Sequence, residues 1–148
     1  MSIWFKKPDP IEVTRRGVGS ANQHVGIEIT EVGPDYLKGR IPVDDRTRQP
    51  GGVLHGGISV VLAETLASWG AEYSVDSSKY YCVGQEVNAN HIRAVKSGWV
   101  NGIAKPLHLG RKSHVWQVFI QDEKGKLVCI SRITMAILNK PSEYKKLN

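Results

Sequence analysis

The sequence contains little cysteine. Its two cysteines, Cys82 and Cys129, are far apart in the chain and stand in apolar, strand-like surroundings. There is no Cys-x-x-Cys pair and no cysteine cluster, so neither a metal site nor a redox centre is indicated. Isolated cysteines commonly behave as small buried residues. We therefore predict two packed free thiols, no disulfide, no bound metal and no cofactor.

The sequence also lacks a long hydrophobic run. No stretch of 18 or more apolar residues occurs, which argues against a membrane-spanning helix. The first eight residues, Met1 to Pro8, do not contain the apolar core of a signal peptide. These two absences predict a cytoplasmic protein without a membrane partner.

Acidic residues are fewer than basic ones. Lys and Arg number 20 against 14 Asp and Glu, which gives a net charge of +6. Lys140, Lys145 and Lys146 contribute to a basic tail predicted over residues 139–148. This balance attracts polyanions such as nucleic acid, anionic lipid or a phosphorylated cofactor. No recognisable nucleic-acid-binding motif is present. We expect no nucleic-acid partner and keep that function as an alternative supported by charge alone.

What the chain does contain is a series of strand patterns around one long helical segment. Strands are predicted over residues 25–32, 36–43, 80–92, 99–109, 115–121 and 127–138, and a helix over 56–73. Asp9-Pro10 predicts a short helix in an N-terminal extension over residues 1–24. Pro106 predicts an edge position or a bulge in its strand. Strands and helices do not alternate, which predicts an α+β fold with a largely antiparallel curved sheet around one helix.

The long helix carries the most unusual feature of the sequence. A loop with four glycines and a histidine, residues 49–57, leads into the apolar segment 58–69, whose one charge is Glu64. A helix that is apolar on all sides is normally buried, and a carboxylate is costly to bury without partners. An ion pair with Arg93 or Arg46 is one explanation. Catalysis is the other, because perturbed carboxylates gather at active sites.

The motif Gln49-Pro50-x-Gly52-Val53-Leu54-His55-Gly56-Gly57, followed by Leu62-Ala63-Glu64, resembles the hotdog-fold acyl-CoA thioesterases. It is most similar to the group that hydrolyses aryl-CoA esters, such as 1,4-dihydroxy-2-naphthoyl-CoA of menaquinone synthesis and 4-hydroxybenzoyl-CoA. The similarity runs from about Val25 to Leu138. It implies a single hotdog domain over residues 1–148 and an enzyme whose substrate, not cofactor, contains coenzyme A. It also implies a homodimer with active sites at the subunit interface, usually paired into a homotetramer.

The resemblance also implies roles for five residues of the helix and its preceding loop. Glu64 corresponds to the family's active-site glutamate, which attacks the thioester or activates water. The amide of Gly56 corresponds to the oxyanion donor, at a helix N-terminus where the helix dipole adds positive potential. Gln49, reaching across from the partner subunit, and His55 help to hold the thioester carbonyl. Ser68 positions water or the leaving group.

Structural explanations remain open for several of these residues. His55 could be a loop histidine that satisfies backbone carbonyls, and Gly56 and Gly57 could be flexible turn residues. Ser68 could bond to its own helix backbone.

The resemblance implies that coenzyme A binds along segments 91–94 and 108–113 and at Gly84. The predicted contacts are Gly84, His91, Ile92, Arg93, Ala94, His108, Leu109, Gly110, Arg111, Lys112 and Ser113. The cationic members suit phosphate groups. For Arg111 and Lys112, a solvated hairpin tip is the alternative.

One departure from the family pattern leaves the acyl group open. The aryl-CoA relatives have Phe-Gly after Gln-Pro, whereas this chain has Gly51-Gly52. A medium- or long-chain acyl-CoA thioesterase of broad specificity is therefore an alternative, as is a hotdog module that binds acyl-CoA without hydrolysing it. A hydratase on the same fold is a further rival, although the family's dehydratases place a different pair of catalytic residues.

Overall fold

The structure is a computed structural model and describes residues 1–141. Lys145 and Lys146, two lysines of the predicted basic tail, lie outside the described residues. Within them, no helix is long and apolar enough to cross a membrane.

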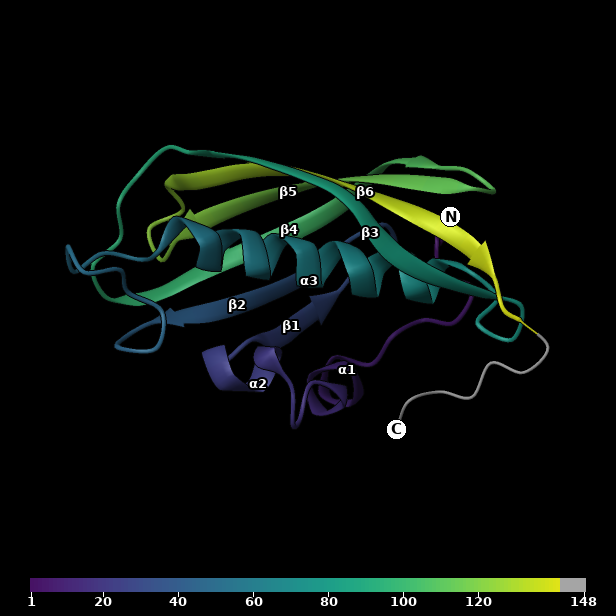
Figure 1. Ribbon diagram of the computed structural model, residues 1–148, viewed down its shortest axis with the longest axis horizontal. Coiled ribbons are helices and arrows are strands. Elements are labelled where there is room, and N and C mark those ends of the chain that lie inside the picture. The colour runs from purple at the N-terminus through teal and green to yellow at the C-terminus, as the bar shows by residue number, and fades with distance from the viewer. Residues whose placement is uncertain (142–148) are drawn as a thin grey trace.

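A six-stranded antiparallel sheet wraps around one long helix, α3 (Figure 1). The strand order is β1-β2-β4-β5-β6-β3. The strands are β1 (Glu28–Val32), β2 (Leu37–Val43), β3 (Tyr80–His91), β4 (Gly98–Leu109), β5 (Ser113–Asp122) and β6 (Leu127–Asn139). The predicted α+β class is confirmed, and the arrangement is the hotdog fold that the resemblance implied.

Helix α3 (Gly56–Ser74) buries one face against the sheet. Leu62, Ala63, Leu66 and Ala67 are fully buried, whereas Glu64 is half-buried. The helix begins at Gly56 because the side chain of His55 caps it, accepting a hydrogen bond from the amide of Gly57. Burial of the apolar face stabilises the fold by about 25 cal/mol for each Å² of apolar surface removed from water.

Two facing glycines let the helix approach the sheet closely. Gly39 on β2 and Gly102 on β4 are direct partners in the sheet. A Cβ atom at Gly39 would lie 2.8 Å from Leu66 Cδ2, and one at Gly102 would lie 2.7 Å from Leu66 Cδ1. Leu66 therefore fills the space that two side chains would otherwise occupy.

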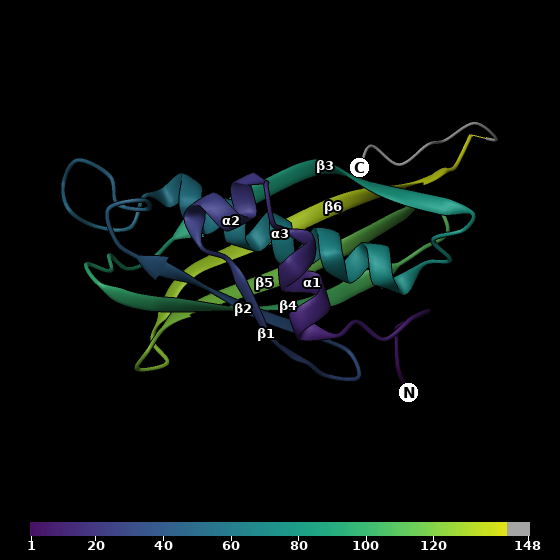
Figure 2. The same ribbon diagram turned by 90° about the horizontal axis from the view of Figure 1, so that it is seen from below.

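The N-terminal extension forms two short helices below α3 (Figure 2). Helix α1 (Pro10–Arg16) has Asp9 as its N-cap and proline in its first turn, as predicted. Helix α2 (Ala21–Val25) was not predicted, and the prediction that a strand starts at Val25 is wrong. Val25 ends α2, Gly26 follows with φ +79°, and β1 starts at Glu28. The apolar alternation was real, because Val25, Ile27 and Ile29 are all buried, but a helix turn supplies the first of them.

The two edges of the sheet differ. At the β1 edge, the extension takes up backbone donors: Ile29 N donates to Thr14 Oγ1 at 2.8 Å, and Ile27 N donates to the Asn22 carbonyl at 2.9 Å. At the other edge, the 12-residue strand β3 pairs with β6 alone. Long, uncovered edges are templates for pairing with another chain.

The predictions for Pro106 and for the two cysteines can also be compared with the structure. Pro106 lies at a bulge, where the register between β4 and β5 shifts, and β4 is an interior strand rather than an edge. Cys82 and Cys129 are both free thiols, Cys82 half-buried and Cys129 buried. Burial, with a smaller contribution from the charge of Glu72, raises the pKa of the Cys82 thiol to about 12.

Candidate active site

Glu64 lines a groove of about 340 Å³ that runs along α3. Within residues 1–141 its carboxylate has neither a hydrogen bond nor an ion pair. The two arginines considered as partners are placed elsewhere: Arg46 pairs with Asp44 at 2.7 Å, and Arg93 lines a different pocket. The structure therefore does not contain the ion pair that would explain Glu64 as a structural residue.

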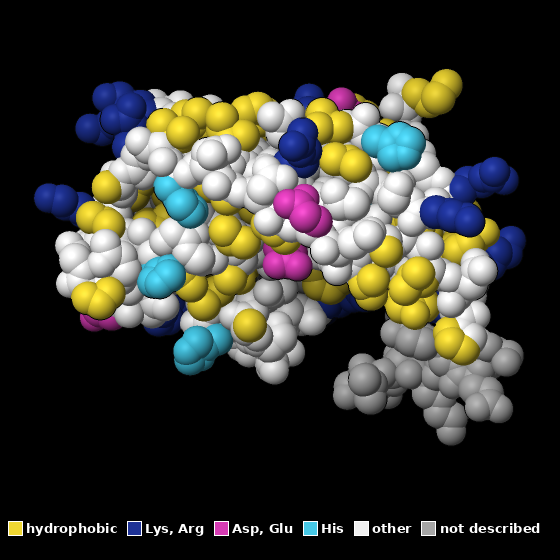
Figure 3. All heavy atoms as spheres, turned by 45° about the horizontal axis from the view of Figure 1, so that its top comes forward, with side chains coloured by type: hydrophobic (Ala, Val, Ile, Leu, Met, Phe, Trp, Pro, Cys, Tyr) yellow, Lys and Arg dark blue, Asp and Glu magenta, His cyan; other side chains and the backbone are white. Residues whose placement is uncertain are grey.

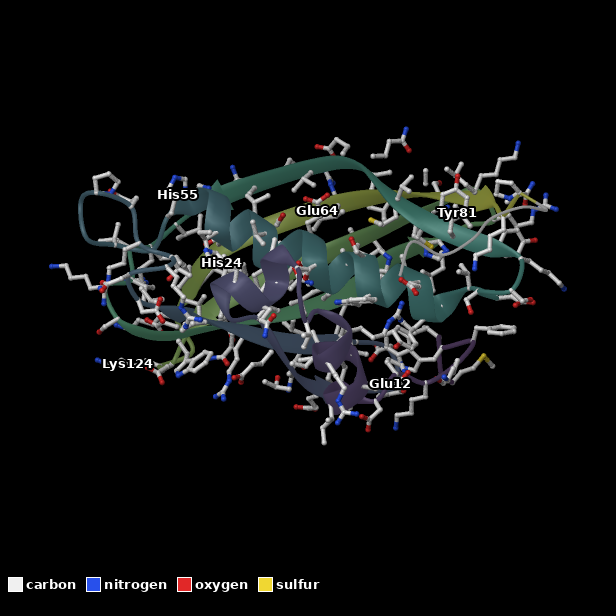
Figure 4. The ribbon with its side chains drawn as sticks, turned by 60° about the horizontal axis from the view of Figure 1, so that its bottom comes forward. Glu12, His24, His55, Glu64, Tyr81 and Lys124 are labelled. Carbon is white, nitrogen blue, oxygen red and sulfur yellow. The ribbon has the colours of Figure 1, made fainter. Side chains whose placement is uncertain are left out.

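Strand β3 makes room for this carboxylate at Gly84. A Cβ atom at Gly84 would lie 2.7 Å from Glu64 Oε1, so only a glycine leaves the carboxylate in place. The register between β3 and β6 also shifts between Gly84 and Glu86. Bulges of this kind are common beside active sites. In Figure 4, Glu64 points from the middle of α3 toward β3, away from His55 at the start of the helix.

Ser68 lies one helical turn after Glu64 and lines the same groove. Its hydroxyl donates a weak hydrogen bond to Met135 Sδ at 3.9 Å, not to the backbone of its own helix. A sulfur acceptor is readily exchanged for water or substrate, so the hydroxyl is available to a ligand in the groove.

The start of α3 offers a free amide. His55 Nδ1 accepts the Gly57 amide at 2.9 Å, so a neutral His55 ring carries its proton on Nε2. Within residues 1–141 the Gly56 amide donates to no protein acceptor. The imidazole of His91 covers Gly56, because a Cβ atom there would lie 2.8 Å from His91 Nε2. A donor at a helix N-terminus is suited to a developing negative charge.

Gln49 folds back on its own loop. Its side-chain carbonyl accepts a hydrogen bond from the Gly51 amide, and Gln49 also lines the pocket of Gly56 and His91. A Cβ atom at Gly51 would lie 3.0 Å from both Oε1 and Nε2 of Gln49. The departure from the family pattern at Gly51 thus affects the residue predicted to hold the thioester carbonyl.

The predicted coenzyme A residues form three groups in one chain. His91, Ile92, Arg93 and Ala94 line the pocket at the start of α3, and Gly84 lies beside Glu64. The segment 108–113 lies at the opposite end of β4, which at about 3.3 Å per residue is roughly 35 Å away.

Basic side chains gather near Arg93. Arg93, Lys96, Lys124 and Lys126 border an adjoining pocket of about 360 Å³. Hydrogen bonds from the backbone amides of Lys126 and Lys124, together with the charge of Arg93, lower the pKa of the Asp122 carboxyl in the same pocket.

Glu64 and the helix N-terminus do not meet within one chain. Gly56 and Glu64 are eight residues apart, which is about 12 Å along the helix axis. A carbonyl held by the Gly56 amide at about 3 Å is therefore out of reach of Glu64 of the same chain.

Five residues that line the Glu64 groove were missed from the sequence: Asn22, Val61, Thr65, Trp69 and Glu72. Glu72 is eight residues after Glu64, so helical spacing could have placed it on the same face. Asn22 has no such signal, because it reaches the groove from α2.

The fold and the groove around Glu64 define a class of enzyme, and comparison with known proteins agrees. Residues 51–129 match the thioesterase superfamily. The chain belongs to this family and is a thioesterase, as the sequence predicted.

Individual relatives are similar over nearly the whole chain. The 1,4-dihydroxy-2-naphthoyl-CoA hydrolase of Escherichia coli (strain K12) is 46% identical over 136 residues, covering 92% of this chain and 99% of that protein. The proofreading thioesterase EntH of Cronobacter turicensis is 44% identical, with 92% and 98% covered. The crystal structure of thioesterase PA1618 from Pseudomonas aeruginosa, carrying Q49A, superposes with a TM-score of 0.93 at 44% identity and covers 94% of this chain and 100% of that one.

Proposed function

We propose that this enzyme hydrolyses a thioester of coenzyme A with an aromatic acyl group, and that Glu64 is its nucleophile or general base. The observation that carries the proposal is the carboxylate of Glu64, which has no protein partner and lies in a groove against Gly84. An unpaired, half-buried carboxylate is costly unless it has a function. The resemblance to acyl-CoA thioesterases supplies that function.

In this mechanism the carboxylate of Glu64 takes a proton from water, and the resulting hydroxide attacks the thioester carbon. Alternatively, Glu64 attacks the carbon itself, and the carbon–sulfur bond breaks to give an anhydride and the coenzyme A thiolate. Water then cleaves the anhydride, which returns the Glu64 carboxylate, releases the acid and supplies a proton to the thiolate. On either route the oxyanion accepts a hydrogen bond from the Gly56 amide, and one such donor contributes about 2.7–4 kcal/mol. Gln49 and the Nε2 proton of His55 hold the carbonyl, and Ser68 orients water. On the general-base route the carbon–sulfur bond breaks after hydroxide attack, and coenzyme A leaves as the thiol after taking the proton from Glu64.

The proposal includes a homodimer, because the catalytic groups are separated within one chain. Gly84 contacts Glu64 and His91 contacts Gly56, and both Gly84 and His91 belong to the edge strand β3. Two β3 strands can pair antiparallel about a two-fold axis midway between Gly84 and His91. Gly84 of each chain then lies opposite residue 91 of the other chain. The Gly56 amide of one subunit then lies near Glu64 of its partner.

The surface around β3 supports this pairing. The face that carries the β3 edge is partly apolar, with acidic and basic side chains near its middle and most Lys and Arg toward its two ends (Figure 3). The β1 edge, by contrast, is covered by the extension. The same two-fold axis places segment 91–94 of one chain and segment 108–113 of the other chain at the same end of the dimer. Pairing of two dimers into a tetramer remains a further part of the proposal.

Three observations bear on substrate and location. Trp69 gives the Glu64 groove a flat aromatic wall, and 340 Å³ is at the small end of ligand pockets. The relative named 1,4-dihydroxy-2-naphthoyl-CoA hydrolase favours an aromatic ester, such as one of menaquinone synthesis, as the proposed substrate class. The two free thiols fit a reducing compartment such as the cytoplasm.

The decisive test is Glu64→Gln, which keeps the shape of the side chain and removes its basicity. We expect kcat for release of coenzyme A to fall by about 10²–10⁴-fold, the usual contribution of a general base. Glu12→Gln, at an exposed position on α1, is the matched control and retains full activity. Wild-type turnover by Glu64→Gln would refute the assignment. A panel of aryl- and fatty acyl-CoA esters then distinguishes an aromatic from a broad specificity.

A further inference from the structure

The groove of Glu64 continues along α3 for two helical turns. Glu64, Ser68 and Glu72 follow one another at intervals of four residues along it, and Trp69 lies on the adjoining row. From Glu64 to Glu72 the groove is about 12 Å long at 1.5 Å per residue. If the thioester carbonyl lies at Glu64, the acyl group can extend about 12 Å along the groove before it reaches Glu72.

The N-terminal extension builds the other wall of this groove. Asn22 on α2 lines it and accepts a hydrogen bond from Thr65 Oγ1 at 3.2 Å. This wall lies outside residues 51–129, the part of the chain that matches the family. The extension is thus placed to change the shape of the acyl site without altering the catalytic residues.

Arg16 of α1 stands at the far end. Its Nη2 donates to Glu72 Oε1 at 2.7 Å, and its Nη1 donates to the Tyr73 hydroxyl at 3.1 Å. Its guanidinium also lies over the Trp69 ring, 4.5 Å from the centroid. Burial by itself lowers the pKa of Arg16, but the hydrogen bonds to Glu72 and Tyr73 outweigh that effect and raise it. One side chain thereby joins α1 to three residues of α3.

We propose that the Arg16–Glu72 ion pair is a latch that closes the distal end of the acyl groove and restricts the enzyme to compact acyl groups. The inference rests on the proposed function, because it takes Glu64 as the position of the thioester carbonyl. A compact ring fits beside Trp69, whose ring Arg16 already contacts, and stops short of the latch. A long chain must displace Arg16, and this breaks an ion pair, a hydrogen bond and a cation–π contact together. Arg16 and Glu72 are positioning residues that determine specificity and take no part in the chemical step.

The geometry also accounts for the form of the latch. Arg16 and Glu72 are each about one third exposed, with side-chain values of 34% and 33%. Arginine suits this position because its planar guanidinium stacks on an aromatic ring while it forms a fork of hydrogen bonds. A lysine would keep the charge but lose most of the stacking.

The test compares the turnover of short and long acyl-CoA esters by Arg16→Ala. If the alanine variant does not fold, Arg16→Met replaces it, because methionine keeps an apolar stem over Trp69. We expect the ratio of kcat/KM for lauroyl-CoA to kcat/KM for benzoyl-CoA to rise by roughly tenfold or more. This is the size of effect seen when a pocket gains or loses room for methylene groups. Arg15→Ala is the matched control, because Arg15 is the exposed neighbour on α1 and lines a different groove. It should leave the ratio unchanged.

Binding is measured in parallel with thioether analogues, benzyl-CoA and dodecyl-CoA, which cannot be hydrolysed. We expect calorimetry to show that wild type prefers benzyl-CoA and that Arg16→Met gains affinity for dodecyl-CoA by roughly tenfold. An unchanged preference in folded Arg16 variants, in either assay, overturns the latch. Absence of hydrolysis of every CoA ester by wild type overturns the proposed function instead, and the thioether result still decides the latch.

Discussion

At the scale of single residues, Gly84 is required for space rather than for backbone freedom. The only atom that a Cβ there would crowd is the end of the flexible Glu64 side chain, at 2.7 Å from Oε1. The fold can therefore accept a methyl group at this position if the carboxylate moves away. Gly84 therefore preserves the position of the Glu64 carboxylate. Substituting it should change catalytic activity while leaving the stability of the fold nearly unchanged.

Gly84→Ala should accordingly lower kcat without unfolding the protein. A displacement of about 1 Å can cost up to 10²-fold in rate, so we expect a loss of roughly 10- to 100-fold. Thermal unfolding should shift little. Val83→Ala, at the exposed neighbouring position on β3, is the control for both measurements. A variant with full activity would show that the carboxylate need not occupy its observed position.

His114 connects stability to pH. It is 3% exposed, and its Nδ1 has no hydrogen-bond partner in the described structure. Burial, and then the nearby charge of His108, lower the pKa of His114 below its ordinary value of 6.5, against a backbone hydrogen bond to Gly110 that raises it. The folded protein thus resists protonation at a residue that the unfolded chain protonates readily.

The sign of the effect follows from linkage. Below about pH 6.5 the unfolded state binds a proton that the folded state does not, so the free energy of unfolding falls as pH decreases. The loss stops growing once the pH is below the folded-state pKa. We expect His114→Gln to flatten this part of the stability profile between pH 7 and pH 5, measured by urea unfolding. His24→Gln, at an exposed position on α2, should follow wild type.

At the scale of elements, the contact between α3 and the sheet depends on the facing glycines Gly39 and Gly102. Leu66 lies over both, and a methyl group at Gly102 would come within 2.7 Å of Leu66 Cδ1. The leucine is fully buried, so it has little freedom to move. This pair sets how close the helix, and therefore Glu64, lies to the strands.

Gly102→Ala should destabilise the fold by overpacking, by about 1–3 kcal/mol. The measurement is the midpoint of urea unfolding at constant m-value. Asn101→Ala, on the next residue of β4 and exposed, should change stability by less than about 0.5 kcal/mol. If both substitutions cost the same, the close approach of α3 is not what Gly102 provides.

At the scale of the whole molecule, the separation of Gly56 from Glu64 predicts an active site shared between two chains. In a mixed dimer of Glu64→Ala and Gln49→Ala subunits, one site carries both defects and the other carries neither. If subunits exchange at random, half of the dimers are mixed, and activity should recover to about a quarter of wild type.

The control for this experiment is a mixture of Glu64→Ala with Glu64→Gln, in which every site lacks the carboxylate and no recovery is expected. Sedimentation of each sample reports whether dimers form. Recovery that fails while mixed dimers are present would place Gln49 and Glu64 in the same chain's site.

Much of this molecule was predictable from local pattern. The long helix, six strands near their observed bounds, the cap at Asp9 and the bulge at Pro106 all follow from periodicity and from the backbone limits of proline. Glu64 stood out because it is the one charge in the apolar segment 58–69, and a lone charge there conflicts with burial. These features depend on neighbours within a few residues, and such neighbours are visible in a sequence.

Other features were decided by tertiary structure alone. The sequence could not show that Gly84 makes room for Glu64, or that Asn22 and Arg16 of the extension reach α3. Helix α2 was hidden for a similar reason, because an apolar alternation fits both a strand and a helix end. The contacts of Gly84, Asn22 and Arg16 with α3 depend on the distance between segments far apart in the chain, and that distance is set by how the sheet curves around α3.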